Sequence, residues 1–90
     1  MRSLTPSVYL LRCRDGSFYT GWTTDLAARV ARHQAGKGAR YTRGRIPVTL
    51  VYYERFPDRA QARRREASLR RLSHATKAAL AARTAGGAAP

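Results

Sequence analysis

The stretch from Val8 to Trp22, VYLLRCRDGSFYTGW, constrains the fold more than any other part of the chain. Two runs rich in β-forming residues, 8–13 and 17–22, flank the turn sequence at 14–16. They predict two antiparallel strands joined by a tight turn. The first run is almost entirely apolar, which is typical of a central strand that is buried on both faces.

The length of the turn decides which side chains share a face, because side chains alternate along a strand. With a two-residue turn at 15–16, Tyr9 and Tyr19 would point to opposite faces. With a three-residue loop and Gly16 in the left-handed conformation, Tyr9 would pair with Gly21 and the two tyrosines would share one face. The sequence permits both registers, and we predict the second. A glycine opposite Tyr9 would also leave room for a close approach to the backbone.

A helix is expected from Asp25 to Ala35, with Thr24 as its N-cap and Gly36 at its end. Arg29 and His33 stand four residues apart, so they lie on one face of this helix, at the edge of its apolar stripe. Side chains at such an edge can reach over the sheet. Both residues also have an explanation without function: Arg29 as a solvated surface residue and His33 as a half-buried histidine whose hydrogen bonds are satisfied.

The remainder of the chain predicts one more strand and two more helices. We expect a loop at 36–47, a strand at 48–53, a helix at 59–71 capped by Asp58, and a helix at 74–83 capped by Ser73. The fold class is therefore α/β (α+β). A small three-stranded, mainly antiparallel sheet is flanked by helices in the order β-β-α-β-α-α, in a single domain over residues 1–83 with a flexible tail at 84–90.

The charge of the chain indicates a polyanionic partner. Lys and Arg number 18 against 5 Asp and Glu, so the net charge is +13. Nucleic acid is the leading partner for such a small basic fold, and solubility alone is the other explanation. Within the expected loop, basic residues alternate with an aromatic one, which suits phosphate contacts and base stacking. These residues are Lys37, Arg40, Tyr41, Arg43 and Arg45, and a solvated connector is the alternative.

The cellular compartment is indicated by cysteine usage and by apolar runs. Cys13 is the only cysteine, so the chain forms neither an internal disulfide nor a cysteine-rich zinc site. No run approaches the roughly 18 apolar residues of a membrane span, and the N-terminus lacks the apolar core of a signal peptide. We expect a soluble cytoplasmic protein without membrane association.

Glu66 is unusual because it is an acid on an apolar stripe. It falls between Ala62 and Leu69 at i, i+4, i+7 spacing, and it is one of only two glutamates in the chain. A salt bridge with the neighbouring arginines is one explanation. A metal ligand is the other.

At this point the chain is seen to resemble the GIY-YIG nuclease superfamily, and in particular its small stand-alone bacterial members. Ser7-Val8-Tyr9 stands where the family has GIY, and Tyr19-Thr20-Gly21 where it has YIG. Arg29 falls at the spacing of the family's arginine, His33 follows, and Glu66 occupies the late acidic position. The likeness continues through HQAGKGARYTRGRIPVTLVYYE and RREASLRRLS, so it spans roughly 8–80.

Two departures from the family pattern stand out. The first tripeptide keeps only its tyrosine. Larger members often carry a late asparagine, and this chain contains no Asn.

The resemblance implies a divalent-metal-dependent endonuclease that hydrolyses phosphodiester bonds in DNA, with RNA as a further partner. Branched, flapped or single-stranded substrates in repair or recombination are the expected targets. The catalytic residues would be Tyr9, Tyr19, Arg29, His33 and Glu66. Glu66 would hold Mg²⁺, or Mn²⁺, as the metal ligand.

The residue types suit these roles. Arg29 would contact the phosphate, Tyr9 would align or deprotonate the attacking water, and His33 would assist as a proton relay. We expect neighbouring positive charge to lower the pKa of the active tyrosine, while the choice between Tyr9 and Tyr19 stays open. The alternatives to an enzyme are a non-catalytic nucleic-acid-binding module with this fold and, more weakly, a ribosome- or RNA-associated protein.

Overall fold

The central strand of the protein is β1 (Ser7–Arg12), which lies between β2 (Phe18–Thr23) and β3 (Thr49–Arg55) in an antiparallel sheet of order β2-β1-β3. The computed structural model describes residues 4–84. In it, every residue of β1 from Ser7 to Leu11 is buried, which confirms a central strand covered on both faces. The expected third strand is also present and extends two residues further, to Arg55.

The turn between β1 and β2 is the three-residue loop that places both tyrosines on one face. Gly16 has φ of +85°, and the Cys13 N–H donates to the Ser17 carbonyl at 2.8 Å. Tyr9 therefore pairs with Gly21. The predicted register is confirmed.

The described residues contain four helices. These are α1 (Leu26–Gln34), α2 (Arg40–Arg43), α3 (Arg59–Arg70) and α4 (His74–Thr84), so the order along the chain is β-β-α-α-β-α-α. The expectation of a plain loop at 36–47 was wrong, because the Ala39 carbonyl accepts the Thr42 and Arg43 N–H groups and starts a helical turn. The last helix runs one residue past the expected boundary, and the rest of the expected tail, 85–90, lies outside the described residues.

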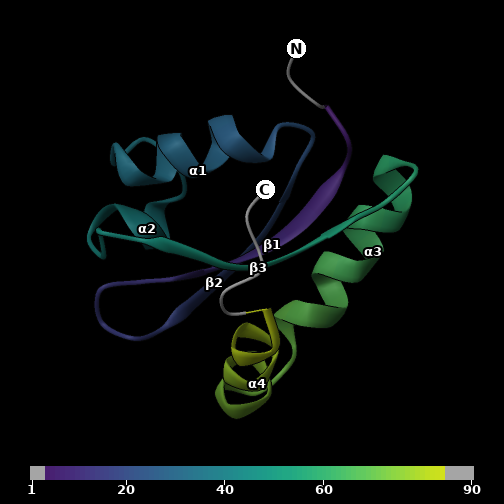
Figure 1. The fold of residues 1–90 in the computed structure, drawn as a ribbon. Coiled ribbons are helices and arrows are strands. Elements are labelled where there is room, and N and C mark those ends of the chain that lie inside the picture. Colours follow the sequence, from purple (N-terminus) through teal and green to yellow (C-terminus); the bar gives the residue numbers. More distant parts are fainter. Residues whose placement is uncertain (1–3, 85–90) are drawn as a thin grey trace.

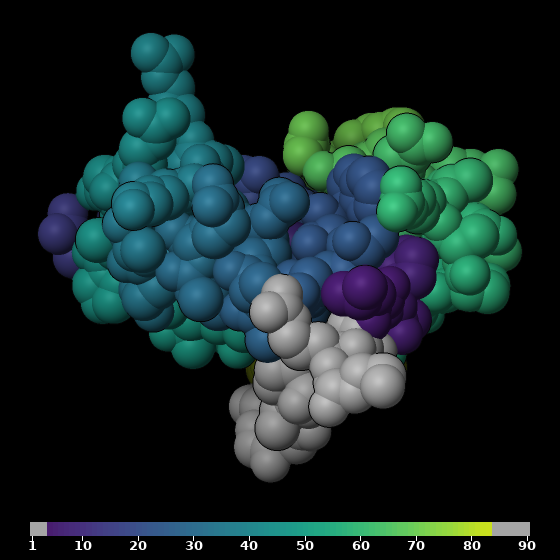
Figure 2. Space-filling model, turned by 90° about the horizontal axis from the view of Figure 1, so that it is seen from above, coloured from purple at the N-terminus to yellow at the C-terminus, as the bar shows by residue number. Residues whose placement is uncertain are grey.

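Two helices cover opposite faces of the sheet (Figures 1 and 2). On the α1 face, Tyr9 and Leu11 pack with Leu26. On the α3 face, Val8 packs with Leu69, because neighbouring residues of a strand point in opposite directions. None of the helices within 4–84 has the length and apolar character needed to cross a membrane.

Helices α1, α3 and α4 each begin directly after a residue whose side chain accepts a hydrogen bond from a free backbone N–H group of the first turn. Asp58 and Ser73 cap α3 and α4 as expected, through bonds of 2.8 and 3.1 Å to backbone N–H groups three residues on. For α1 the expected cap, Thr24, was wrong. Asp25 is the cap, with its carboxylate 3.2 Å from the N–H three residues later, because Thr23 accepts the Asp25 N–H and delays the helix by one residue.

Candidate active site

Tyr9 and His33 form the buried centre of the site. The Tyr9 hydroxyl lies 2.9 Å from His33 Nε2, and the two residues are 0% and 1% exposed. The other ring nitrogen, His33 Nδ1, lies 2.7 Å from the Thr42 hydroxyl, which donates in turn to the Ala39 carbonyl at 3.0 Å. Strand β1 and helices α1 and α2 thus each contribute one member of a continuous hydrogen-bonded chain.

The burial of Tyr9 bears on the direction of these hydrogen bonds. Among the described residues, His33 Nε2 is the acceptor within reach of the phenol proton. We assign the phenol proton to the bond with Nε2 and the ring proton to Nδ1, where the Thr42 hydroxyl accepts it because that hydroxyl already donates to the Ala39 carbonyl. The Ala39 N–H also lies within 3.4 Å of Nδ1. His33 is then a neutral acceptor that faces Tyr9.

Two glycines allow the chain to close around this pair. A Cβ at Gly21 would lie 2.5 Å from the Tyr9 hydroxyl, and one at Gly38 would lie 2.7 Å from His33 Cγ, distances that real carbon atoms do not show. The space expected opposite Tyr9 is thus filled by its own phenol. Any larger residue at either position would displace a member of the pair.

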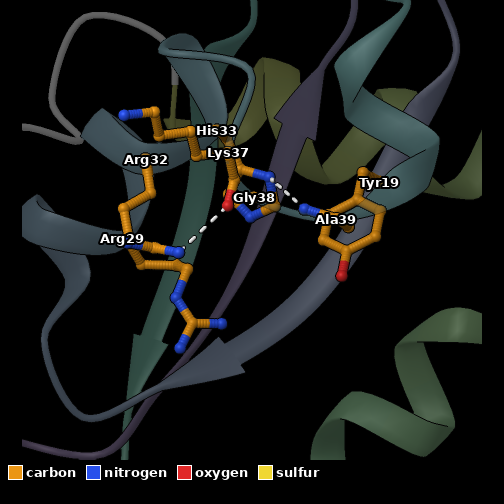
Figure 3. Close-up of a pocket in the computed structure, with 7 residues that line it drawn as sticks. All are labelled: Tyr19, Arg29, Arg32, His33, Lys37, Gly38 and Ala39. Atoms are coloured by element: carbon orange, nitrogen blue, oxygen red, sulfur yellow. Dashed lines mark hydrogen bonds between the residues drawn. The ribbon is translucent and has the colours of Figure 1, made fainter.

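A pocket of about 290 Å³ opens beside His33 (Figure 3). The Arg29 guanidinium and the Tyr19 hydroxyl point to the same side of this pocket, and the Tyr19 ring lies 5.1 Å from the His33 ring. Its lining contains three cationic residues and no carboxylate: Tyr19, Arg29, Arg32, His33, Lys37, Gly38 and Ala39. Its chemistry favours an anion of the size of a phosphate group.

Burial dominates the electrostatics of the pair. Desolvation raises the pKa of the Tyr9 phenol well above its ordinary value, the neighbouring Tyr19 adds to the rise, and Arg29 opposes it only in part. The expected lowering of the tyrosine pKa was therefore wrong for Tyr9, because loss of water outweighs nearby positive charge. Desolvation also lowers the pKa of His33, helped by Arg29 and Arg32. Both groups of the pair are neutral near pH 7.

Glu66 comes from α3, on the opposite side of the sheet from α1. Its carboxylate forms an ion pair with Arg70, whose guanidinium also donates to the Thr20 carbonyl of β2 at 3.3 Å. The Glu66 side chain is only 17% exposed, and its charge contributes to the raised pKa of Tyr9, so it lies within electrostatic range of the phenol. The salt bridge considered for this residue is present.

The donor set around Glu66 fits a magnesium ion that arrives with its substrate. Residues 4–84 contain no cluster of three or more His, Cys, Asp or Glu side chains that would hold a metal by themselves. Mg²⁺ commonly uses one or two carboxylates and completes its shell with waters and phosphate oxygens. One half-buried carboxylate within electrostatic range of Tyr9 meets that requirement.

The residues expected to bind nucleic acid divide into four groups. Lys37 lines the pocket beside His33, whereas Arg40 and Tyr41 line a second, adjoining pocket. Arg45 pairs with Asp15 at 3.0 Å. Arg43 is exposed at the end of α2.

Three residues around the site were missed by sequence reasoning. Arg32 lies one turn after Arg29 on α1, and that spacing could have identified it. Arg70 was considered only as an ion-pair partner of Glu66, four residues before it, and not as a residue that lines a pocket. Thr42 had none, since a threonine in an expected loop carries no pattern.

Membership of a known family is decided by the match of the whole domain. The family model of the GIY-YIG catalytic domain matches residues 5–79. The chain belongs to the GIY-YIG family. It therefore belongs to a family of nucleases, proteins that bind nucleic acid and typically use a divalent metal.

Several relatives support this membership over most of the chain. A UPF0213 protein of Halobacterium salinarum is 55% identical over 73 residues, which cover 81% of this chain and 95% of that protein. A UPF0213 protein of Streptococcus sanguinis is 51% identical over 72 residues, with 80% and 83% covered. The resemblance read from the sequence is confirmed.

Two solution NMR structures share the GIY-YIG fold of this chain. The UPF0213 protein BH0048 of Bacillus halodurans aligns with a TM-score of 0.57 and 44% identity, covering 92% of this chain and 88% of that one. Protein EF2693 of E. faecalis aligns with the same TM-score and 38% identity, covering 86% and 83%. The predicted fold class is confirmed.

Proposed function

We propose that this protein is an endonuclease that hydrolyses phosphodiester bonds in DNA with Mg²⁺ or Mn²⁺. The observation that carries the proposal is the buried Tyr9–His33 hydrogen bond beside a cationic pocket without carboxylates. A phosphate in that pocket would bring a reacting phosphorus atom next to a pair of groups that can move one proton.

Arg29 and Tyr19 would hold the scissile phosphate. Arg29 offers a fork of N–H donors to the non-bridging oxygens, where charge develops during attack. The Tyr19 hydroxyl points to the same side of the pocket and would donate a further hydrogen bond.

Tyr9 and His33 would remove the proton of the attacking water together. The raised pKa of Tyr9 disfavours a phenolate at rest. Because the phenol is closed off from solvent in this structure, bound substrate would have to open the site before water could reach it. The phenol oxygen would then accept the proton of water while its own proton moves to His33 Nε2. The water oxygen bonds to phosphorus as the bond from phosphorus to the leaving oxygen breaks. The leaving oxygen would take a proton from solvent, and the imidazolium would return its proton to the Tyr9 oxygen as the phenol releases the proton taken from water to solvent. This relay needs a neutral histidine, which the lowered pKa of His33 supplies near pH 7.

Glu66 would be the protein ligand of the metal, with phosphate oxygens and waters as the other ligands. When bound, the metal would neutralise charge on the phosphate and on the leaving oxygen. Binding requires Glu66 to exchange its ion pair with Arg70, which is exposed enough to move, at 61%.

The net charge of +13 would draw the protein to DNA or RNA at rates that fall steeply with salt. Branched, flapped and single-stranded DNA are the proposed substrates, in repair or recombination within the cytoplasm. These finer assignments rest on the family resemblance and on charge.

A panel of labelled substrates tests the proposal. Duplex, nicked, flapped, junction, single-stranded DNA and RNA substrates are incubated with wild-type protein and Mg²⁺, Mn²⁺ or EDTA. We expect metal-dependent cleavage of at least one substrate, loss of cleavage in Glu66→Gln, and retention in Glu54→Gln. Glu54 is the matched control because it is the only other glutamate and is likewise paired with an arginine, Arg65. Equal cleavage by wild-type protein and Glu66→Gln would exclude the metal role.

A second function is favoured by one observation. Because Glu66 is already neutralised by Arg70, the protein could bind nucleic acid without turnover. That function predicts salt-sensitive binding with no product on any substrate or metal. Multiple turnovers per protein molecule in the same panel would rule it out.

A further inference from the structure

A second pocket adjoins the proposed catalytic one along the edge of the sheet. It has a volume of about 460 Å³, within the range of roughly 300–1,000 Å³ common for small-ligand sites. Tyr19 and Ala39 line both pockets, so the two are neighbours. The lining residues are Phe18, Tyr19, Thr20, Ala39, Arg40, Tyr41, Arg70 and Lys77.

Cations from both halves of the chain meet in this pocket. Arg40 belongs to α2, whereas Arg70 and Lys77 belong to the end of α3 and to α4. Lys77 has no carboxylate partner among residues 4–84, and its ammonium group donates to the Arg70 carbonyl at 3.4 Å. Burial and the neighbouring Arg70 lower the pKa of Lys77, as expected for an ammonium that lacks an anion. The lining contains no acidic residue. Arg70 is already paired with Glu66, so an anionic group would relieve the positive charge that remains on Lys77 and Arg40.

The same pocket has an aromatic wall that is held in place. The Tyr41 ring is 38% exposed and lies 6.1 Å from the Tyr19 ring at an interplanar angle of 29°. Arg45 fixes it: the guanidinium lies 4.0 Å from the ring centroid, donates to the Tyr41 carbonyl at 2.8 Å, and pairs with Asp15. An exposed aromatic side chain that is already ordered loses little entropy when a flat ligand packs against it.

We propose that this pocket is a nucleotide subsite, in which Lys77 and Arg70 bind a phosphate group and the wall of Tyr41 and Tyr19 receives an unpaired base. The proposal deepens the proposed nuclease function. The nucleotide next to the scissile phosphate would sit here, so a substrate would need a base free of its partner strand at this position. Free nucleotide would occupy the same subsite as a weak competitor.

The aromatic wall and the cations together favour a ligand that carries both a flat ring and an anionic group. Phosphate alone would not use the aromatic wall, and a nucleoside alone would not use the three cations. A nucleoside monophosphate uses both. Affinity should therefore depend on the two parts being joined.

The test measures binding to the full-length wild-type protein in EDTA by isotope-edited NMR titration. The probes are deoxyadenosine monophosphate, deoxyadenosine and inorganic phosphate. We expect the nucleotide to bind about tenfold or more tightly than either part. Lys77→Ala and Tyr41→Ala should each weaken nucleotide binding about tenfold, as for the loss of a charge-assisted hydrogen bond or a stacking contact. Arg83→Ala is the control, because it removes an exposed cation from α4 outside the pocket.

Any of the following results would contradict the proposed nucleotide subsite. Nucleotide binding no tighter than phosphate binding, or a loss in Lys77→Ala with none in Tyr41→Ala, would reduce the pocket to a simple anion site. An equal loss in Arg83→Ala would attribute binding to overall charge. Because the proposed cleavage requires metal and the titration is run in EDTA, a negative titration alongside metal-dependent cleavage would refute the subsite and leave the nuclease proposal standing.

Discussion

Tyr9 and His33 are 24 residues apart in the chain, yet the hydroxyl of one lies 2.9 Å from Nε2 of the other, and neither side chain reaches solvent. Burying two polar groups destabilises a fold unless each group keeps its hydrogen-bond partners. Here Thr42 satisfies the far side of the imidazole. The proposed chemistry depends on this arrangement, and the following predictions address it.

Gly38→Ala should disrupt the pair without touching a catalytic group. A Cβ there would lie 2.7 Å from His33 Cγ, so the ring or the loop must shift. A displacement of this kind can cost about 100-fold in rate. Gly44→Ala is the matched control on the same segment, because its Cβ would meet nothing within 4 Å and its φ is −93°. Equal activity of the two variants, measured as cleavage rate, would show that the position of His33 does not matter.

The stability of the protein should fall as the pH drops below about 6.5. The pKa of His33 is lowered in the folded state, so the unfolded chain binds a proton that the folded one does not. The free energy of unfolding then declines with decreasing pH, by at most about 1.4 kcal/mol per pH unit for one proton. Thermal melts between pH 7.5 and 5.5 measure this.

His33→Gln should abolish that dependence, whereas His74→Gln should keep it, because His74 is exposed, bonds to the Gly16 carbonyl and does not line the pocket beside His33. A wild-type melting temperature that stays constant over this range would show that His33 is freely protonated in the fold.

Thr42 should act as a positioning residue through His33. Thr42→Val keeps the shape of the side chain but removes the acceptor of the Nδ1–H, at 2.7 Å. We expect a cleavage rate about tenfold lower, the size of one lost hydrogen bond, and an altered pH–rate profile because the ring loses its fixed tautomer. Thr42→Ser should restore both. A uniform loss with an unchanged pH profile would indicate a merely structural role.

Much of the fold could be predicted because local patterns determined it. The DG turn, the alternation of strand residues and the caps at Asp58 and Ser73 each act within a few residues. Short-range competition explains the failures. Thr23 captured the Asp25 N–H and moved the start of α1, and a single carbonyl at Ala39 was enough to nucleate α2 in a glycine-rich segment.

The site was predictable in its residue types but not in its electrostatics. Spacing placed Arg29 and His33 on one face and both tyrosines on one side of the sheet, as the structure has them. The pKa of Tyr9 depends instead on complete burial, which arises when Gly21 and α1 close over the phenol. The hydrogen bond between Thr42 and His33 was likewise not predictable, because it requires α2, which no sequence pattern predicted.

The central claim is that Tyr9 takes part in hydrolysis, and a single-turnover cleavage assay with Mg²⁺ tests it most directly. Tyr9→Phe removes the hydroxyl alone, and Tyr53→Phe is the matched control, because Tyr53 pairs with Tyr9 across β1 and β3. We predict that Tyr9→Phe cleaves about 10²- to 10⁴-fold more slowly than the wild type, while Tyr53→Phe cleaves at the wild-type rate. A Tyr9→Phe protein that is folded and cuts as fast as the wild type would contradict the account.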